Sequence, residues 1–160
     1  MRRRPTSRLL VLDPHQRVLL FHFCFHTANG VEKRFWATPG GGLESNESFT
    51  DAARRELREE TGLLLEPGPE VACNHVIYDL PDGETVQAEE RFFLVRAPSA
   101  QMSAAGQSSL ERKVIRDHRW WSVRDIRASD ALIYPTDIAD LVAKALLSPT
   151  SPARPRELHL

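Results

Sequence analysis

The sequence predicts an α/β fold in which a mixed β-sheet is covered by helices on its faces. The chain has 160 residues with 41% hydrophobic content, which suits one globular domain. Extended segments open the chain, a helical segment follows, and further strands and a last helical segment complete it. This order is typical of a sheet with helices packed against it.

The first elements are two strands. Residues 7–13 and 17–25 are rich in Leu, Val and Phe, and the turn-prone sequence Asp-Pro-His-Gln at 13–16 separates them, so we expect a hairpin. A polar loop at 26–33 and a brief extended piece at 35–37 follow.

A glycine-rich loop comes next, with Gly40, Gly41 and Gly42 after Pro39. Consecutive glycines allow backbone angles that are closed to other residues. Such a loop can present main-chain groups to a ligand.

Residues 48–61 predict the clearest helix. They are good helix formers, Ser48 is a suitable N-cap, and Gly62 stands where a left-handed C-terminal cap belongs.

The second half of the chain predicts another hairpin, with strands at 71–80 and 85–97 around Pro81-Asp82-Gly83. The remaining predicted segments are a loop at 98–109, a strand at 118–122, a helix at 136–147 and a flexible tail at 148–160. We therefore expect one domain over residues 1–147.

Composition narrows the class of partner. A formal charge of −1 and a pI near 6.6 argue against a long nucleic acid or an anionic membrane as partner, and leave a small phosphorylated ligand possible. The first apolar run, 9–12, is too short for a signal peptide, and no stretch approaches the ~20 apolar residues of a membrane span. We expect a cytoplasmic protein of unknown oligomeric state.

The two cysteines also favour a cytoplasmic location. Cys24 and Cys73 stand alone in apolar runs and predict buried thiols of a reducing compartment. The arginines of the first eight residues could reach a phosphate, although such terminal charge clusters are usually solvated; they are Arg2, Arg3, Arg4 and Arg8.

Glutamates occupy the apolar side of the predicted helix. With about 3.6 residues per turn, one stripe contains Phe49, Ala52, Ala53, Glu56, Leu57 and Glu60. Glu56 and Glu60 stand where leucine is expected. Glu59 lies on the flank of this stripe, so three carboxylates converge.

Buried carboxylates must be paired, protonated or bound to a cation. Three hard oxygen ligands without a nearby His or Cys favour Mg²⁺ or Mn²⁺. Arg55 is four residues from Glu59 and could orient it, whereas it points away from its neighbour Glu56. The alternative is a surface helix with i,i+4 ion pairs worth only ~0.3–0.5 kcal/mol each.

The pattern G-x(5)-E-x(7)-R-E-L-x-E-E-x-G-L runs from Gly41 to Leu63. It resembles the signature of the Nudix hydrolase family at every defined position. The resemblance implies an α/β/α sandwich and Mg²⁺- or Mn²⁺-dependent cleavage of a nucleoside diphosphate linked to another moiety. ADP-ribose, dinucleoside polyphosphates and nucleoside triphosphates are examples of such substrates.

The same resemblance implies roles for individual residues. Metal ligands are expected at Glu56, Glu59, Glu60 and the backbone carbonyl of Gly40. Catalytic roles are expected for Glu56, Glu59, Arg55 and Glu111. Glu111 resembles a later acid that serves as general base in some members, and Glu89 and Glu90 compete for this role. Glu47 is expected to support the junction of loop and helix.

The sequence does not determine which residues contact the substrate. Trp36 and Tyr78 are candidates to stack on a base, although aromatic residues in strands more often belong to the core. A domain that binds a nucleotide as a sensor without cutting it is the alternative function. An isomerase of the same superfamily is disfavoured because neither cysteine stands in a recognisable isomerase pattern.

Overall fold

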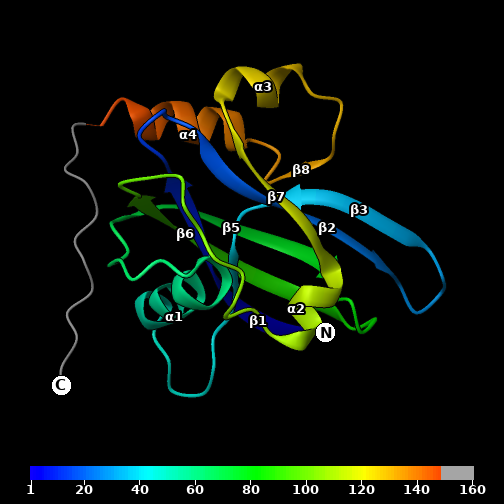
Figure 1. The fold of residues 1–160 in the computed structure, drawn as a ribbon. Helices are drawn as coiled ribbons and strands as arrows, with labels where there is room; N and C mark the ends of the chain where they lie inside the picture. Colours follow the sequence, from blue (N-terminus) through cyan, green and yellow to red (C-terminus); the bar gives the residue numbers. More distant parts are fainter. Residues whose placement is uncertain (149–160) are drawn as a thin grey trace.

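The computed structural model describes residues 1–148, and its sheet and helices are shown in Figure 1. The strands are β1 (Arg2–Leu12), β2 (Val18–His26), β3 (Glu32–Ala37), β4 (Gly40–Gly42), β5 (Glu70–Asp79), β6 (Thr85–Arg96), β7 (Ile115–Trp121) and β8 (Ile133–Tyr134). The helices are α1 (Phe49–Thr61), α2 (Ser109–Val114), α3 (Val123–Ala128) and α4 (Ile138–Leu146).

The strands form a mixed sheet, as predicted. Its order is β5–β6–β1–β2–β3–β8, with β4 paired to β1 and β7 paired to β2. β1 runs parallel to β6 along its whole length and antiparallel to β4. Leu9, Leu10 and Val11 in β1 are fully buried, so this strand is at the centre of the fold.

Helices cover both faces of the sheet. On one face Ala53 and Leu57 of α1 pack against Leu9 and Val11. On the other face α3 and α4 pack against alternate residues of the same strand, including Leu10 and Leu12 (Figure 1). Because successive side chains of a strand point to opposite faces, one continuous apolar strand supplies both cores. The α/β/α sandwich predicted above is confirmed.

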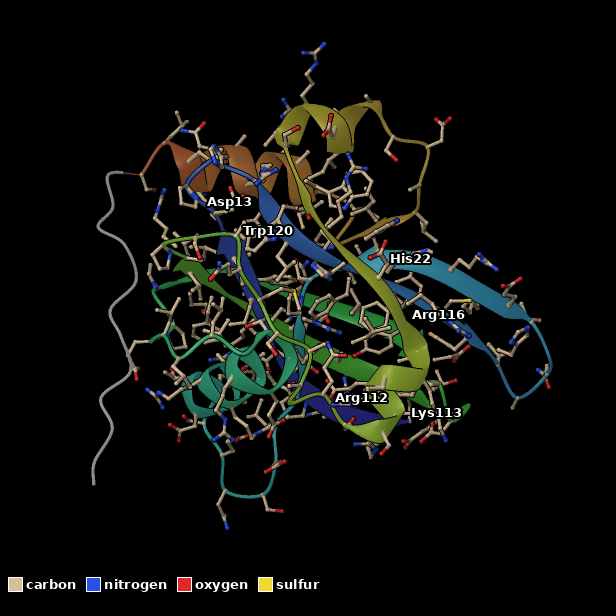
Figure 2. The ribbon with its side chains drawn as sticks, viewed as in Figure 1. Asp13, His22, Arg112, Lys113, Arg116 and Trp120 are labelled. Atoms are coloured by element: carbon tan, nitrogen blue, oxygen red, sulfur yellow. The ribbon has the colours of Figure 1, made fainter. Side chains whose placement is uncertain are left out.

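The turn between β1 and β2 is built by Asp13, which Figure 2 labels. The Asp13 carboxylate accepts hydrogen bonds from the backbone N–H groups of His15 and Arg17, each at 2.9 Å. The predicted hairpin is present, but its pairing is confined to the register of Leu12 with Val18. Beyond that point β2 pairs with β3 and β7 instead.

The clearest differences from the sequence predictions are short elements. α2, α3 and β8 were not predicted, and β7 begins at Ile115, three residues earlier than expected. Elements this short depend on packing and capping more than on propensity. For α2, a capping box between Ser108 and Glu111 fixes the first turn.

Cys73 is exposed, and the expectation that both cysteines are buried is wrong for it. The reason is that β5 is the edge strand of the sheet and has a strand neighbour on one side only. Cys24 is buried as predicted.

None of the helices in residues 1–148 is both long and apolar enough to cross a membrane. The tail predicted at 148–160 lies, apart from its first residue, outside the described residues.

Candidate functional site

The acidic helix α1 forms where the sequence places it. The Ser48 hydroxyl accepts a hydrogen bond from the backbone N–H of Asp51 at 3.0 Å, and Gly62 ends the helix with a φ of 75°. Glu56 is 7% exposed and Glu60 only 1% exposed. Two carboxylates therefore occupy the buried side of this helix, which is the side that usually carries leucine.

The glycine-rich segment β4 lies directly against these carboxylates. The backbone N–H of Gly40 donates a hydrogen bond to Glu60 Oε1 at 2.9 Å. A Cβ on Gly41 would collide with the Glu56 carboxylate, and one on Gly40 would collide with the backbone of Ser7. The glycines are required here because β4 fits between β1 and α1.

Arg55 connects the loop, the helix start and the carboxylates. Its Nε and Nη2 atoms each lie 2.8 Å from the carboxylate of Glu47, and Nη2 also donates to the carbonyl of Gly42 at 3.1 Å. Its Nη1 atom donates to Glu59 at 3.3 Å and to Glu56 at 2.9 Å. The contact with Glu56 was not expected from the helical wheel; it forms because the long side chain of Arg55 bends along the helix surface.

Glu111 joins the buried carboxylates from another part of the chain. Ligand oxygens of Glu56, Glu60 and Glu111 all lie within 4.8 Å of one another, and we refer to these three residues as the carboxylate cluster. Glu111 lies in the first turn of α2, where its carboxylate also accepts a hydrogen bond from the backbone N–H of Ser108 at 2.9 Å.

The other predicted acids lie outside this cluster. Glu59 has a side chain that is 33% exposed and is paired with Arg55. Glu90 forms an ion pair with Arg8 at 2.7 Å, and Glu89 bonds to Arg91. Among the later glutamates considered from sequence, the structure brings Glu111 to Glu56 and Glu60.

The electrostatics of the cluster are unfavourable without a cation. Burial raises the pKa of Glu60 well above its usual value, and the neighbouring carboxylates of Glu56 and Glu111 raise it further. Burial also raises the pKa of Glu56, against the opposing effect of Arg55. A hard divalent cation would relieve both effects, and an all-oxygen donor set is the kind that Mg²⁺ and Mn²⁺ accept.

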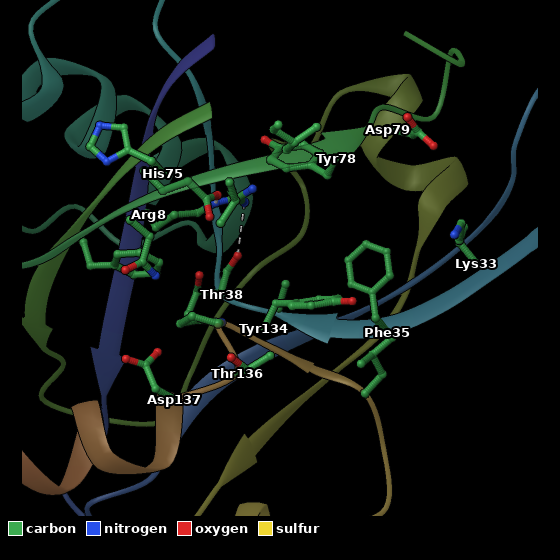
Figure 3. A pocket seen from close by; sticks show the side chains of 18 of the residues that line it. Arg8, Lys33, Phe35, Thr38, His75, Tyr78, Asp79, Tyr134, Thr136 and Asp137 are labelled. Atoms are coloured by element: carbon green, nitrogen blue, oxygen red, sulfur yellow. Dashed lines mark hydrogen bonds and ion pairs between the residues drawn. The ribbon is translucent and has the colours of Figure 1, made fainter. Parts of the chain in front are cut away.

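A cavity of about 1150 Å³ opens on the sheet face opposite α1 (Figure 3). Its lining includes Arg8, Phe35, Thr38, Tyr78, Glu90, Phe92, Tyr134, Thr136 and Asp137. The rings of Phe35 and Tyr134 form an edge-to-face pair with centroids 5.5 Å apart. The cavity thus combines aromatic surfaces with a small set of polar groups, as ligand pockets do.

The two aromatic candidates from sequence have different positions. Tyr78 lines the cavity. Trp36 is not among the lining residues; it stacks on His22 at 4.7 Å and packs against Trp121 at 5.2 Å. Because neighbouring residues of a strand face opposite sides, Phe35 occupies the cavity side of β3 in place of Trp36.

Two arginines of β1 link the cavity to the carboxylate cluster. Arg8 lines the cavity, and its side chain passes within 2.9 Å of where a Cβ on Gly40 would lie. Arg4 lies beside Gly42, with Nε 3.2 Å from the corresponding Cβ position, and donates a hydrogen bond to the Tyr78 hydroxyl at 2.8 Å.

These arginines were expected to be solvated, because no sequence motif marks the positions that they occupy. Their alternation with buried residues in β1 was the available signal: Arg4, Thr6 and Arg8 share one face of the strand.

Comparison with known proteins gives one family. A family model described as the NUDIX domain matches residues 2–140. An uncharacterized Nudix hydrolase of Bacillus subtilis, YvcI, is 33% identical over 94 residues, which is 58% of this chain and 54% of that protein. The chain thus matches about half the length of this relative.

Solved structures show the same fold. A MutT NUDIX hydrolase from Burkholderia pseudomallei superposes with a TM-score of 0.62 at 22% identity, covering 87% of this chain and 96% of that one. The NUDIX domain of Shewanella oneidensis NrtR, complexed with ADP ribose, gives a TM-score of 0.63 at 16% identity and covers 91% and 90%.

Proposed function

The chain belongs to the NUDIX family, and from this premise we propose that it hydrolyses the pyrophosphate linkage of a nucleoside diphosphate joined to another moiety. The observation that carries the proposal is the carboxylate cluster of Glu56, Glu60 and Glu111, whose oxygens lie within 4.8 Å of one another. A buried acidic group of this kind is costly unless it serves a cation.

The residues that would hold Mg²⁺ or Mn²⁺ are Glu56 and Glu60, with the backbone carbonyl of Gly40 and the more exposed Glu59 as further oxygen ligands. Bound there, a divalent ion would neutralise pyrophosphate oxygens and lower the pKa of an attacking water. The donor set fits this ion because it consists of oxygen atoms alone.

The proton of the attacking water needs an acceptor. We assign this role to Glu111, because it approaches the cluster from a different element than α1 and is less buried than Glu60. Arg55 positions the carboxylates of Glu56 and Glu59, to which its Nη1 atom donates. Because Glu47 fixes the guanidinium of Arg55 on one side, the guanidinium can hold both carboxylates in place.

Arg4 is the residue that we assign to the phosphates of the substrate. It is half-buried, and none of the ion pairs found in residues 1–148 includes it. Its hydrogen-bond partners are the uncharged hydroxyls of Thr6 and Tyr78. By contrast Arg8 is neutralised by Glu90. A guanidinium that lies outside these ion pairs, next to Gly42 and Tyr78, suits a phosphate oxygen.

The cavity would receive the nucleoside. Phe35 and Tyr134 offer ring faces and edges to a base, and Thr136 and Asp137 add polar groups at the start of α4. A domain of the same fold, that of Shewanella oneidensis NrtR, is complexed with ADP ribose, which supports a nucleoside diphosphate joined to a sugar as the class of ligand. We propose substrates of about the size of ADP-ribose.

The proposal is tested by incubating the protein with Mg²⁺ and a panel of ADP-ribose, dinucleoside polyphosphates, nucleoside triphosphates and sugar nucleotides. We expect turnover of at least one compound, with products in which a phosphoanhydride bond has been cut. Tight nucleotide binding without turnover would favour the sensor function instead. Neither binding nor turnover of any compound would reject both.

A further inference from the structure

A second group of metal-ligating side chains lies on the hairpin of β5 and β6, away from the carboxylate cluster. Cys73 and His75 are two residues apart in β5, so they point to the same face of the strand. Glu89 of β6 is the direct cross-strand partner of His75. Ligand atoms of Cys73, His75 and Glu89 all lie within 4.8 Å of one another.

This group occupies the rim of the cavity but not its interior. The next residues of β5 in alternation, including Tyr78, face the interior, and Figure 3 shows the His75 ring directed away from Thr38 and Tyr134. Glu89 lies on the same side of β6 as Phe93, which belongs to the core under α1. The group therefore belongs to the sheet face that α1 only partly covers.

The chemistry of the three donors differs from that of the carboxylate cluster. A thiolate, an imidazole and a carboxylate together are a ligand set for zinc, whereas magnesium and manganese take oxygen ligands. We propose that Cys73, His75 and Glu89 bind one Zn²⁺ ion, with the fourth position left to water. The proposal is independent of the hydrolase function.

The geometry is close to what zinc requires. Tetrahedral coordination at bond lengths of about 2.0–2.3 Å places donor atoms roughly 3.3–3.8 Å apart. The donors here are within 4.8 Å, and Cys73 and His75 are exposed, so small side-chain rotations bring them together and leave the ion a path of entry. The paired strands hold the backbone of all three residues in register.

Arg91 interacts with two of the ligands, because it hydrogen-bonds to Cys73, its cross-strand partner, as well as to Glu89. It donates to the Glu89 carboxylate at 3.0 and 3.2 Å. It also has two other partners, because Glu70 lies at 3.6 Å and the Phe49 ring is 4.0 Å from the guanidinium carbon. Arg91 can therefore release Glu89 to a metal ion while its charge stays compensated.

Cobalt spectroscopy tests the site directly. The chain is freed of metal, Mg²⁺ is added in excess to occupy the carboxylate cluster, and Co²⁺ is then titrated. We expect one equivalent to give a thiolate-to-cobalt charge-transfer band that Zn²⁺ abolishes. The band should be absent in Cys73→Ser and present in Cys24→Ser, the matched control at the second cysteine. A wild-type protein without the band, or a band that survives in Cys73→Ser, overturns the proposal.

The other two ligands are tested by zinc affinity. Competition with a chromophoric chelator should show Zn²⁺ binding at least ~10-fold weaker in His75→Ala and in Glu89→Gln, a loss of about 1.4 kcal/mol each. Circular dichroism and melting in EDTA check that both variants fold like the wild type. Unchanged zinc affinity in both folded variants means that the cysteine binds without its neighbours, which contradicts a three-ligand site.

Discussion

The carboxylate cluster and the cavity are built in different ways. Glu56 and Glu60 come from one helix, and Gly40, which bonds to Glu60, precedes that helix by a short loop. The cavity is assembled from strands and loops that are distant in sequence, among them Arg8, Phe35, Tyr78 and Tyr134. The difference teaches that two of the three members of the carboxylate cluster are placed by local sequence, whereas Glu111 and the whole cavity depend on tertiary packing.

The largest effect is expected from the carboxylate cluster. Glu56→Gln and Glu60→Gln should each lower turnover at least ~100-fold, because each removes charge from the proposed metal ligands. Glutamine retains the shape and can still accept the hydrogen bond from Gly40, so the fold should be intact by circular dichroism. Asp51→Asn, on the outer side of the same helix, is the control and should retain near-normal turnover. Near-normal hydrolysis in both glutamine variants would contradict the role of the cluster.

A smaller effect is expected from substitution of Arg4, which links the cavity to the carboxylate cluster. Arg4→Gln should raise KM at least ~10-fold, because a charge-assisted hydrogen bond to phosphate contributes about 1.5–3 kcal/mol. Arg2→Gln is the matched control, since Arg2 is exposed and paired with Glu84 at 2.7 Å. Steady-state kinetics at saturating Mg²⁺ measures both. An equal KM for the two variants would remove Arg4 from the phosphate site.

In the cavity, single substitutions should have a weaker effect. Phe35→Ala and Tyr134→Ala should each raise KM by roughly 2- to 13-fold, the range that corresponds to about 0.5–1.5 kcal/mol for an aromatic contact. Turnover at saturating substrate should change less than KM, because these rings lie away from the carboxylates. A loss confined to kcat in both variants would show that the cavity is not where the base binds.

The smallest effect is on stability. Because burial and neighbouring carboxylates raise the pKa of Glu60 in the folded chain, the folded state binds this proton more tightly than the unfolded state. The stabilisation is complete below the ordinary carboxyl pKa of about 4.3 and is lost as the pH rises through the folded-state value.

In EDTA at neutral pH, Glu60→Gln should therefore melt higher than the wild type, by roughly 2–4 °C for each kcal/mol of relieved repulsion. The difference between the two proteins should shrink as the pH is lowered into the acid range. Calorimetry in EDTA measures it, and a lower melting temperature for Glu60→Gln at neutral pH would show that the ionised carboxylate does not strain the fold.

The helical repeat made the helix that carries Glu56 and Glu60 predictable. Two acids at spacing four on an otherwise apolar stripe, with the cap residues Ser48 and Gly62 at its ends, predict both the helix and its burial. Glu111 was found through a family resemblance, because nothing in its own neighbourhood indicates that α2 would turn it toward Glu56.

The cavity was not predictable in the same way. Trp36 and Phe35 are neighbours in a short strand, and only the pairing of β3 with β2 and β8 decides which ring faces the cavity. The alternation in β1 indicates which face of the strand Arg4 shares with Arg8, but not that Gly42 and Tyr78 approach it from two other strands. Contacts that depend on sheet register cannot be read from local spacing.

The most direct test of the central claim is anomalous diffraction from crystals of this protein soaked in Mn²⁺. We expect a manganese peak enclosed by the carboxylates of Glu56, Glu60 and Glu111. Side chains that point apart into solvent, with no ion between them at saturating Mn²⁺, would contradict a metal-dependent hydrolase.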